Sequence, residues 1–391
     1  MMRHAILVTA VVLACLYGFS GVAVHATVWS IQTVDSGGDV GSFNSLALSS
    51  DGQPRISYFD ATNFDLKYAA RNGSSWNIQP VDSTGNVGLS PSLALDSSDH
   101  PHIAYGAWLG SPPYSDLKYA AWNGSSWGIQ TAYYGSHTGN QVSLALDSGD
   151  APHIASYQSW PYGNLLRYTY WNGSAWSSGT PGGGGNGVIG ISLGLDGSDN
   201  PHLSYYDYQS QGLRYLARNG SWASQLLDAV PYVSGTVLDT SLVVDGSGNP
   251  HISYLIGAGV LKYAAWDGSA WHIDTVDCTT FANWTTALAL DASGDPHIVY
   301  YDDTNNDIKY AAWDACASSW DIETVASVDI GEWSDLGLAV DSCGNVHISY
   351  YDATNGDLKY AYGAIPEPLT MLGMFLGLGG VGAYIRKRRR A

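Results

Sequence analysis

The 391-residue sequence is poor in charged residues, which make up 13% of it, with only 16 Lys and Arg against 35 Asp and Glu. The formal net charge of −19 argues against nucleic-acid binding, because that function needs a basic surface to displace counterions from phosphate. Only four methionines stand beside 46 glycines, which argues against a helical protein. The low charge does not indicate disorder, because 45% of the residues are hydrophobic and the chain has 15 Trp and 27 Tyr. Such a chain can bury a large core.

The N-terminal segment resembles a targeting signal rather than part of a fold. Arg3 and His4 precede an apolar run that begins at Ala5, and Val24-His25-Ala26 fits a small-x-small cleavage site. This pattern predicts a secretory signal peptide over residues 1–26, removed by signal peptidase. A lipoprotein signal that uses Cys15 is the alternative, although the apolar run continues past that residue.

The C-terminal segment, residues 365–391, contains Pro366-Glu367-Pro368, an apolar stretch over 369–385 and a basic cluster over 386–390. Seventeen helical residues rise about 25 Å, just enough to cross a bilayer core, and the basic cluster should stay cytoplasmic. A plain membrane anchor is one interpretation. The three parts in this order also resemble the PEP-CTERM sorting signal of Gram-negative bacteria, although Ile365 stands where Val is commonest. The resemblance implies transient anchoring in the inner membrane, cleavage by exosortase, release to the cell surface or extracellular matrix, and an association with exopolysaccharide.

The sequence between these ends is repetitive. A SLALD-like segment begins at seven positions, 46 to 51 residues apart: Ser45, Ser92, Ser143, Ser192, Ser241, Ala287 and Gly337. This spacing is typical of propellers and repeat arrays. Each unit continues with a turn, a HISYYD-like run, a variable loop, a DLKYAAW-like run and a WxIQTVD-like run, which predicts four short strands. Asn-Gly or Asp-Gly pairs between the last two runs predict type I′ turns, in which both residues have positive φ.

The seventh unit ends without a WxIQTVD-like run, and that run instead occurs at Trp29 to Asp35. We expect the N-terminal segment to complete the last unit, as a closed ring requires. The sequence therefore predicts an all-β, seven-bladed β-propeller over residues 27–364. Its SLALD runs should be the inner strands and its WxIQTVD runs the outer strands.

A meander of four strands places the variable loops and the links between blades on one face of the propeller. Binding residues are common on such loops. Aromatic residues beyond the repeat consensus occur there in three adjacent units: Trp108, Tyr114, Trp160, Tyr162 and Tyr208. Aromatic rings stack on the apolar faces of sugars. We therefore expect a glycan-binding site at these residues, with ordinary loop packing as the alternative.

One histidine occurs at the same register in six units, in the order His102, His153, His202, His251, His297 and His347. A residue repeated in every blade is expected to solve a structural problem, here by bonding to the aspartate that ends each SLALD run. D-x-T-N-x-D segments begin at Asp60, Asp302 and Asp352, and we expect Asx turns there, with calcium binding as the alternative. No other cofactor or metal is expected.

The repeats loosely resemble the sialidase-like and lectin propellers. A sialidase implies three clustered arginines, but Arg55, Arg71, Arg167, Arg214 and Arg218 lie in three different registers of the repeat. The leading hypothesis is therefore a non-enzymatic exported propeller that binds a glycan or a protein partner. A polysaccharide-degrading hydrolase or lyase and a purely structural matrix protein remain open.

Three cysteines remain once residues 1–26 are removed. Export would place them where disulfides persist. Cys316 and Cys343 lie in turns expected on the same face of neighbouring blades, which predicts a disulfide between them and leaves Cys278 free.

Overall fold

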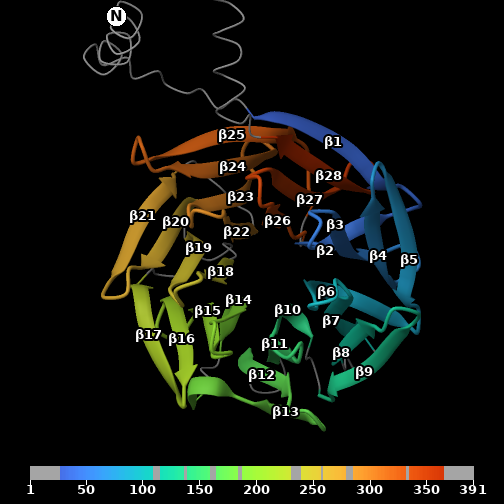
Figure 1. Ribbon diagram of the computed structural model, residues 1–391, viewed down its shortest axis with the longest axis horizontal. Coiled ribbons are helices and arrows are strands. Elements are labelled where there is room, and N and C mark those ends of the chain that lie inside the picture. The colour runs from blue at the N-terminus through green and yellow to red at the C-terminus, as the bar shows by residue number, and fades with distance from the viewer. Residues whose placement is uncertain are drawn as a thin grey trace, which may run out of the picture. The chain divides into compact units, whose positions relative to one another are not determined.

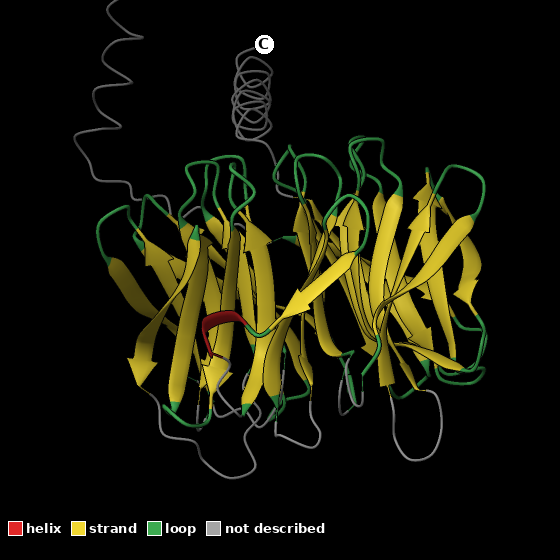
Figure 2. Cartoon of the chain, turned by 90° about the horizontal axis from the view of Figure 1, so that it is seen from below, coloured by secondary structure: helices red, strands yellow, loops and turns green. Residues whose placement is uncertain are grey.

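The computed structural model describes residues 27–108, 115–135, 139–158, 164–183, 187–229, 239–256, 259–278, 285–331 and 334–364. Within these ranges, Trp29–Ala364 forms one compact unit of seven antiparallel four-stranded sheets. Figure 1 shows the sheets as blades around a central axis, and Figure 2 shows their strands running between the two faces that carry the loops. The all-β, seven-bladed propeller predicted from the sequence is confirmed. The predicted signal peptide (1–26) and sorting segment (365–391) lie outside the described residues.

Each blade is a meander whose first strand is nearest the axis. Blade 1 consists of β2 (Val40–Leu48), β3 (Pro54–Asp60), β4 (Asp65–Asn72) and β5 (Ser75–Asp82). Blade 2 consists of β6 (Asn86–Leu95), β7 (Pro101–Trp108), β8 (Ser115–Trp122) and β9 (Trp127–Tyr133). Blade 3 consists of β10 (Asn140–Leu146), β11 (Pro152–Gln158), β12 (Leu165–Trp171) and β13 (Trp176–Gly179), followed by the 3₁₀ turn η1 (Pro181–Gly183).

The remaining blades follow the same order. Blade 4 consists of β14 (Val188–Leu195), β15 (Pro201–Asp207), β16 (Gly212–Asn219) and β17 (Ser221–Ala229). Blade 5 consists of β18 (Thr240–Val244), β19 (Pro250–Ile256), β20 (Val260–Trp266) and β21 (Trp271–Asp277). Blade 6 consists of β22 (Thr286–Leu290), β23 (Pro296–Asp302), β24 (Asp307–Asp314) and β25 (Ser319–Ser327). Blade 7 consists of β26 (Gly337–Val340), β27 (Val346–Asp352), β28 (Asp357–Ala364) and, from the other end of the chain, β1 (Val28–Asp35).

The core lies between neighbouring blades rather than within one. One cluster joins Leu66 and Tyr68 of blade 1 to Val87, Ile103 and Tyr105 of blade 2. The tryptophan that begins each outer strand packs edge-on against a tyrosine of the preceding blade. These seven pairs are Trp76–Tyr360, Trp127–Tyr68, Trp176–Tyr119, Trp222–Tyr168, Trp271–Tyr215, Trp320–Tyr263 and Trp29–Tyr310. The repeated tryptophans therefore hold the blades together.

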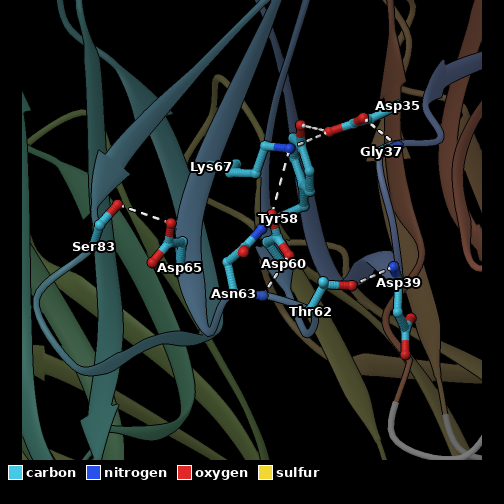
Figure 3. A network of polar contacts seen from close by, with 10 residues as sticks. All are labelled: Asp35, Gly37, Asp39, Tyr58, Asp60, Thr62, Asn63, Asp65, Lys67 and Ser83. Atoms are coloured by element: carbon cyan, nitrogen blue, oxygen red, sulfur yellow. Dashed lines mark hydrogen bonds and ion pairs between the residues drawn. The ribbon is translucent and has the colours of Figure 1, made fainter.

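A polar network also joins the closing blade to its neighbour. The Asp35 carboxylate of β1 accepts hydrogen bonds from the Tyr58 hydroxyl (2.7 Å) and the Lys67 ammonium (2.5 Å) of blade 1 (Figure 3). Burial alone would raise the pKa of Asp35, but the bonds from Lys67 and Tyr58 outweigh it and lower that pKa. The same arrangement joins blades 1 and 2 through Asp82 and blades 4 and 5 through Asp228. Closure of the ring by β1, predicted from the sequence, is confirmed.

The hairpin turns between the third and fourth strands differ from the prediction. Gly124 and Gly173 both have φ of 92°, but Asn123 and Asn172 do not have positive φ, so these turns are not type I′. Four residues separate the paired Trp122 and Trp127, whereas a type I′ hairpin has two. The Asn123 side-chain oxygen instead accepts hydrogen bonds from the backbone N–H groups of the next residues in the turn. The Asn-Gly pair thus forms an Asx turn.

Candidate functional site

The repeated histidines are engaged within the fold, as the sequence analysis expected. In blade 7 the Tyr360 hydroxyl bonds to Nδ1 of His347 at 2.6 Å, and Nε2 of His347 lies 3.4 Å from Asp341. Blade 4 has the same arrangement with Tyr215, His202 and Asp196. Burial lowers the pKa of all six histidines below the usual value. Neutral imidazoles fit these bonds, because Nδ1 accepts from tyrosine while Nε2–H points to the aspartate.

The D-x-T-N-x-D segments form the expected Asx turns. The Asp60 carboxylate accepts bonds from the backbone and side chain of Asn63, both at 3.0 Å. The equivalent bonds join Asp302 to Asn305 and Asp352 to Asn355. Within the described ranges, no group of three or more His, Cys, Asp or Glu side chains is arranged to hold a metal. The side-chain oxygens of these turns are thus occupied by protein donors.

The aromatic residues predicted to bind glycan are only partly described. Trp108 ends β7 and is 49% exposed. Tyr208 follows β15 and packs edge-on against Tyr206, so it is half-buried. Both lie at the end of the second strand of their blades, which places them on the same face. Tyr114, Trp160 and Tyr162 lie outside the described residues, so the aromatic site remains a prediction.

The three cysteines among the described residues are exposed and free. The predicted Cys316–Cys343 disulfide is therefore not formed in the structure. Cys316 lies in the turn between the two outer strands of blade 6, whereas Cys343 lies in the turn between the two inner strands of blade 7. The two turns lie at different distances from the axis, while a disulfide needs Cα atoms within about 7 Å.

The inter-blade pocket, a hollow between blades 3 and 4, was not predicted from the sequence. It consists of two adjoining cavities of about 380 and 250 Å³ that share Tyr168, Tyr170, Arg218 and Gly220. The larger cavity is also lined by Trp222 and by hydroxyl-bearing residues, including Ser177, Ser178 and Ser221. Aromatic rings, hydroxyls, one cation and the Asp199 carboxylate therefore meet in a single surface hollow.

The repeat departs from its own pattern at this pocket. Arg218 stands where blades 2, 3, 5 and 6 carry Trp122, Trp171, Trp266 and Trp313, each packed against the tryptophan of its own outer strand. Tyr170 stands where five blades carry alanine. The turn before Trp222 is one residue shorter than its equivalents in blades 1, 2, 3 and 5, and β13 has only four residues. A missing tryptophan, a short turn and a short outer strand leave the hollow open.

Contacts between rings hold Tyr170 in place, and Arg218 lies near the ring of Trp222. Tyr170 stacks on His153 at 5.8 Å and on Tyr168 at 5.6 Å between ring centroids. The Arg218 guanidinium lies 6.0 Å from the Trp222 ring centroid. Among the residues that the structure describes, no carboxylate lies within 4.0 Å of this guanidinium and no hydrogen bond to it is formed. The pocket therefore offers an unpaired cation beside the Trp222 ring, in a lining that also includes Tyr168 and Tyr170.

Blade 7 and blade 1 meet through a similar set of residues, Tyr360, Tyr362, Arg71 and Trp76. There, however, Nε of Arg71 donates a hydrogen bond to the Gly73 carbonyl at 2.9 Å, and the guanidinium lies over Tyr360 at 5.4 Å. Arg71 is thus engaged by the protein itself. The sequence contained the signal for both places, an arginine in a tryptophan register. Whether such an arginine is engaged or free depends on the residues of the neighbouring blade, which the sequence does not identify.

The axial pocket is a second hollow, of about 470 Å³, at the ends of the inner strands on the face that carries Trp108 and Tyr208. Its lining includes Asp239, Thr285, Ser334 and Asp335. Burial raises the pKa of Asp239 to about 8, with a further contribution from the charge of Asp335. Burial also raises the pKa of Asp335 to about 7. These residues precede the SLALD segments and differ between blades, so the repeat pattern did not reveal them.

Comparison with known proteins supports the fold but not a family. No protein-family model and no curated protein matches the chain. Among solved structures, an ulvan lyase of polysaccharide lyase family PL25 is 14% identical, with a TM-score of 0.58 over 85% of this chain and 96% of that one. The Aleuria aurantia lectin, in complex with Fucα1-6GlcNAc, is 15% identical, with a TM-score of 0.52 over 73% and 96%. The protein AofleA from Arthrobotrys oligospora is 14% identical, with a TM-score of 0.52 over 78% and 90%.

At these identities the likeness shows a shared propeller fold alone. These structural neighbours include a lectin in complex with Fucα1-6GlcNAc and a polysaccharide lyase. Within the described residues, no helix is long and apolar enough to span a membrane.

Proposed function

We propose that this chain is an exported β-propeller that binds glycans through the inter-blade pocket. The observation that carries the proposal is the unpaired Arg218 guanidinium beside Trp222, in a pocket that Tyr170 also lines. Sugar rings stack on aromatic faces, and a guanidinium donates paired hydrogen bonds to vicinal hydroxyls or to a uronate carboxylate. The serine hydroxyls at the pocket wall supply further bonds to sugar hydroxyls.

The loop aromatics form a second contact on the opposite face in this proposal. Trp108 is the exposed member among the described residues, and Tyr208 lies on the same face. Tyr114, Trp160 and Tyr162 belong to the same set by sequence. A long polysaccharide would be able to engage two faces of one propeller, or bridge two propellers.

Location at the cell surface is part of the same proposal. The small-x-small site at residues 24–26 favours removal of residues 1–26 by signal peptidase. Pro366-Glu367-Pro368, the apolar run and the basic cluster favour recognition by exosortase, with transient anchoring and later release. An exported propeller of this kind would meet exopolysaccharide or another surface glycan.

A glycan array on the purified full chain tests the proposal, followed by titration of the best ligand. Arg218→Trp restores the residue that four other blades carry, so it should fold normally while filling the pocket. We expect it to weaken binding at least tenfold, and Arg218→Lys to weaken it less. Arg71→Trp is the matched control, because it makes the same change in the same register where the arginine is already engaged. Equal loss in both tryptophan variants, or no loss in Arg218→Trp, would reject the pocket.

Polysaccharide cleavage is the alternative function, and the same experiment addresses it. Incubation of the ligands found on the array with the protein should release no reducing ends and no unsaturated products. Release of either product would make the protein an enzyme.

A further inference from the structure

The two sides of the axial pocket differ in chemistry. Blades 1, 2 and 4 contribute apolar side chains, among them Phe43, Leu89 and Ile191. Blades 5 to 7 contribute the acidic and hydroxyl side chains, among them Asp239 and Asp335. The carboxylates of the pocket therefore lie on one side only, although Asn44, Ser45 and Gln141 bring polar side chains from blades 1 and 3.

Two carboxylates flank blade 6 on this acidic side of the pocket. Asp239 precedes β18 of blade 5, and Asp335 precedes β26 of blade 7. Oδ2 of Asp239 accepts a hydrogen bond from the Thr286 backbone N–H at 3.0 Å. The described residues that line the pocket include no lysine, arginine or histidine. Across the described part of the chain, no basic group lies within 4.0 Å of either carboxylate. Withdrawing such charges from water without a counter-charge is costly.

An unpaired hydroxyl lies on the same side of the pocket. Ser334 is 3% exposed and lines the pocket, and its Oγ has no hydrogen-bond partner among the described residues. The neighbouring Thr285 hydroxyl is already engaged, since its Oγ1 accepts the Leu336 backbone N–H at 3.2 Å. A buried polar group without a partner is uncommon in folded proteins and calls for an explanation.

We propose that the axial pocket binds one divalent cation, of the Ca²⁺ type, between Asp239, Asp335 and the Ser334 hydroxyl. The available donors are all oxygens, which hard cations prefer. A cation would compensate both carboxylates, whereas a neutral sugar would not. Donors from separate blades suit Ca²⁺, which tolerates irregular coordination and takes up water as ligands, better than Mg²⁺, which demands a near-ideal octahedron. With two carboxylates, we expect a dissociation constant on the order of 10⁻⁴–10⁻³ M.

Calorimetric titration of the chelator-treated full chain with CaCl₂ tests this site, with Tm measured in parallel. We expect one site per chain and a rise in Tm with Ca²⁺. Asp335→Asn and Asp239→Asn should each weaken binding at least tenfold and abolish the rise in Tm, while Ser334→Ala should weaken binding a fewfold.

Asp274→Asn is the control for lost charge, because Asp274 is exposed on β21, and it should bind Ca²⁺ as the unmodified chain does. Tm without Ca²⁺ shows that each variant is folded. No change in heat or Tm with Ca²⁺, unchanged binding in Asp335→Asn, or stronger binding of MgCl₂ would overturn the proposal. The result does not bear on the proposed glycan binding, because this experiment contains no glycan.

Discussion

Replacement of Asp35 by alanine tests how the ring is closed. Asp35 lies on β1, which comes from the opposite end of the repetitive region and completes blade 7. Its carboxylate accepts bonds from Tyr58, Lys67 and Gly37 (Figure 3). The side chains of Asp35 and Lys67 are only 9% and 16% exposed, so the pair is largely shielded from water. Asp35→Ala would leave the Tyr58 hydroxyl and the Lys67 ammonium without this partner.

The cost can be bounded from the structure. Breaking a buried ion pair by removing one partner typically costs about 3–5 kcal/mol. Lys67 keeps Asp60 at 3.5 Å as a second partner, which reduces the loss, so we expect about 2–4 kcal/mol. At about 2.1 cal/mol/K per residue, the unfolding entropy of this propeller is about 0.7 kcal/mol/K. The expected fall in Tm is therefore about 3–6 °C.

Differential scanning calorimetry at neutral pH measures this fall. Asp321→Ala is the matched control, because Asp321 lies exposed on the outer strand β25 and makes no ion pair among the described residues. Its Tm should stay within about 1 °C of the unmodified protein. Equal Tm values for Asp35→Ala and Asp321→Ala would refute the role assigned to the network.

Three further outcomes follow from the fold. Deletion of residues 27–40 should unfold or oligomerise the propeller, because blade 7 loses its outer strand; size-exclusion chromatography showing a stable monomer would contradict this. Trp108→Ala should weaken glycan binding with little change in Tm, because Trp108 is 49% exposed, whereas a large fall in Tm would identify it as a packing residue. Acidification from pH 7.5 to 5 should lower Tm, because burial lowers the pKa of six histidines below the usual 6.5 and the unfolded chain therefore takes up protons first. The pKa values of Asp239 and Asp335 are raised in the folded state, so acidification stabilises the protein through these two groups. The pH series is therefore best measured in the double variant Asp239→Asn, Asp335→Asn. An unchanged Tm in that variant would disprove the histidine effect.

The fold was predictable because the same residues recur at the same positions in nearly every blade, which revealed both the repeat and its four strands. The early end of the seventh repeat, together with the isolated run from Trp29 to Asp35, indicated the shared blade. The repeated histidines were correctly assigned to hydrogen bonding within the blades. The turn type was not predicted correctly. The Asn123 side chain accepts a hydrogen bond from the turn backbone, and Asn123 does not have the positive φ that a type I′ turn requires.

The candidate sites were less predictable, because each is built across blades. Arg218 stands in a register where four other blades carry tryptophan, but the sequence did not show that Tyr170 of the preceding blade lines the same pocket. The axial pocket depends on residues just before the SLALD segments, where the blades differ. The closed ring decides which of those side chains lie on the same side of the axis, and only the three-dimensional structure shows this.

A crystal structure of the full chain with the strongest glycan from the array tests the central claim most directly. We predict a sugar ring between Tyr170 and Trp222, with its hydroxyls or carboxylate within hydrogen-bond distance of the Arg218 guanidinium. A ligand bound elsewhere, with the inter-blade pocket empty at saturating glycan, would contradict it.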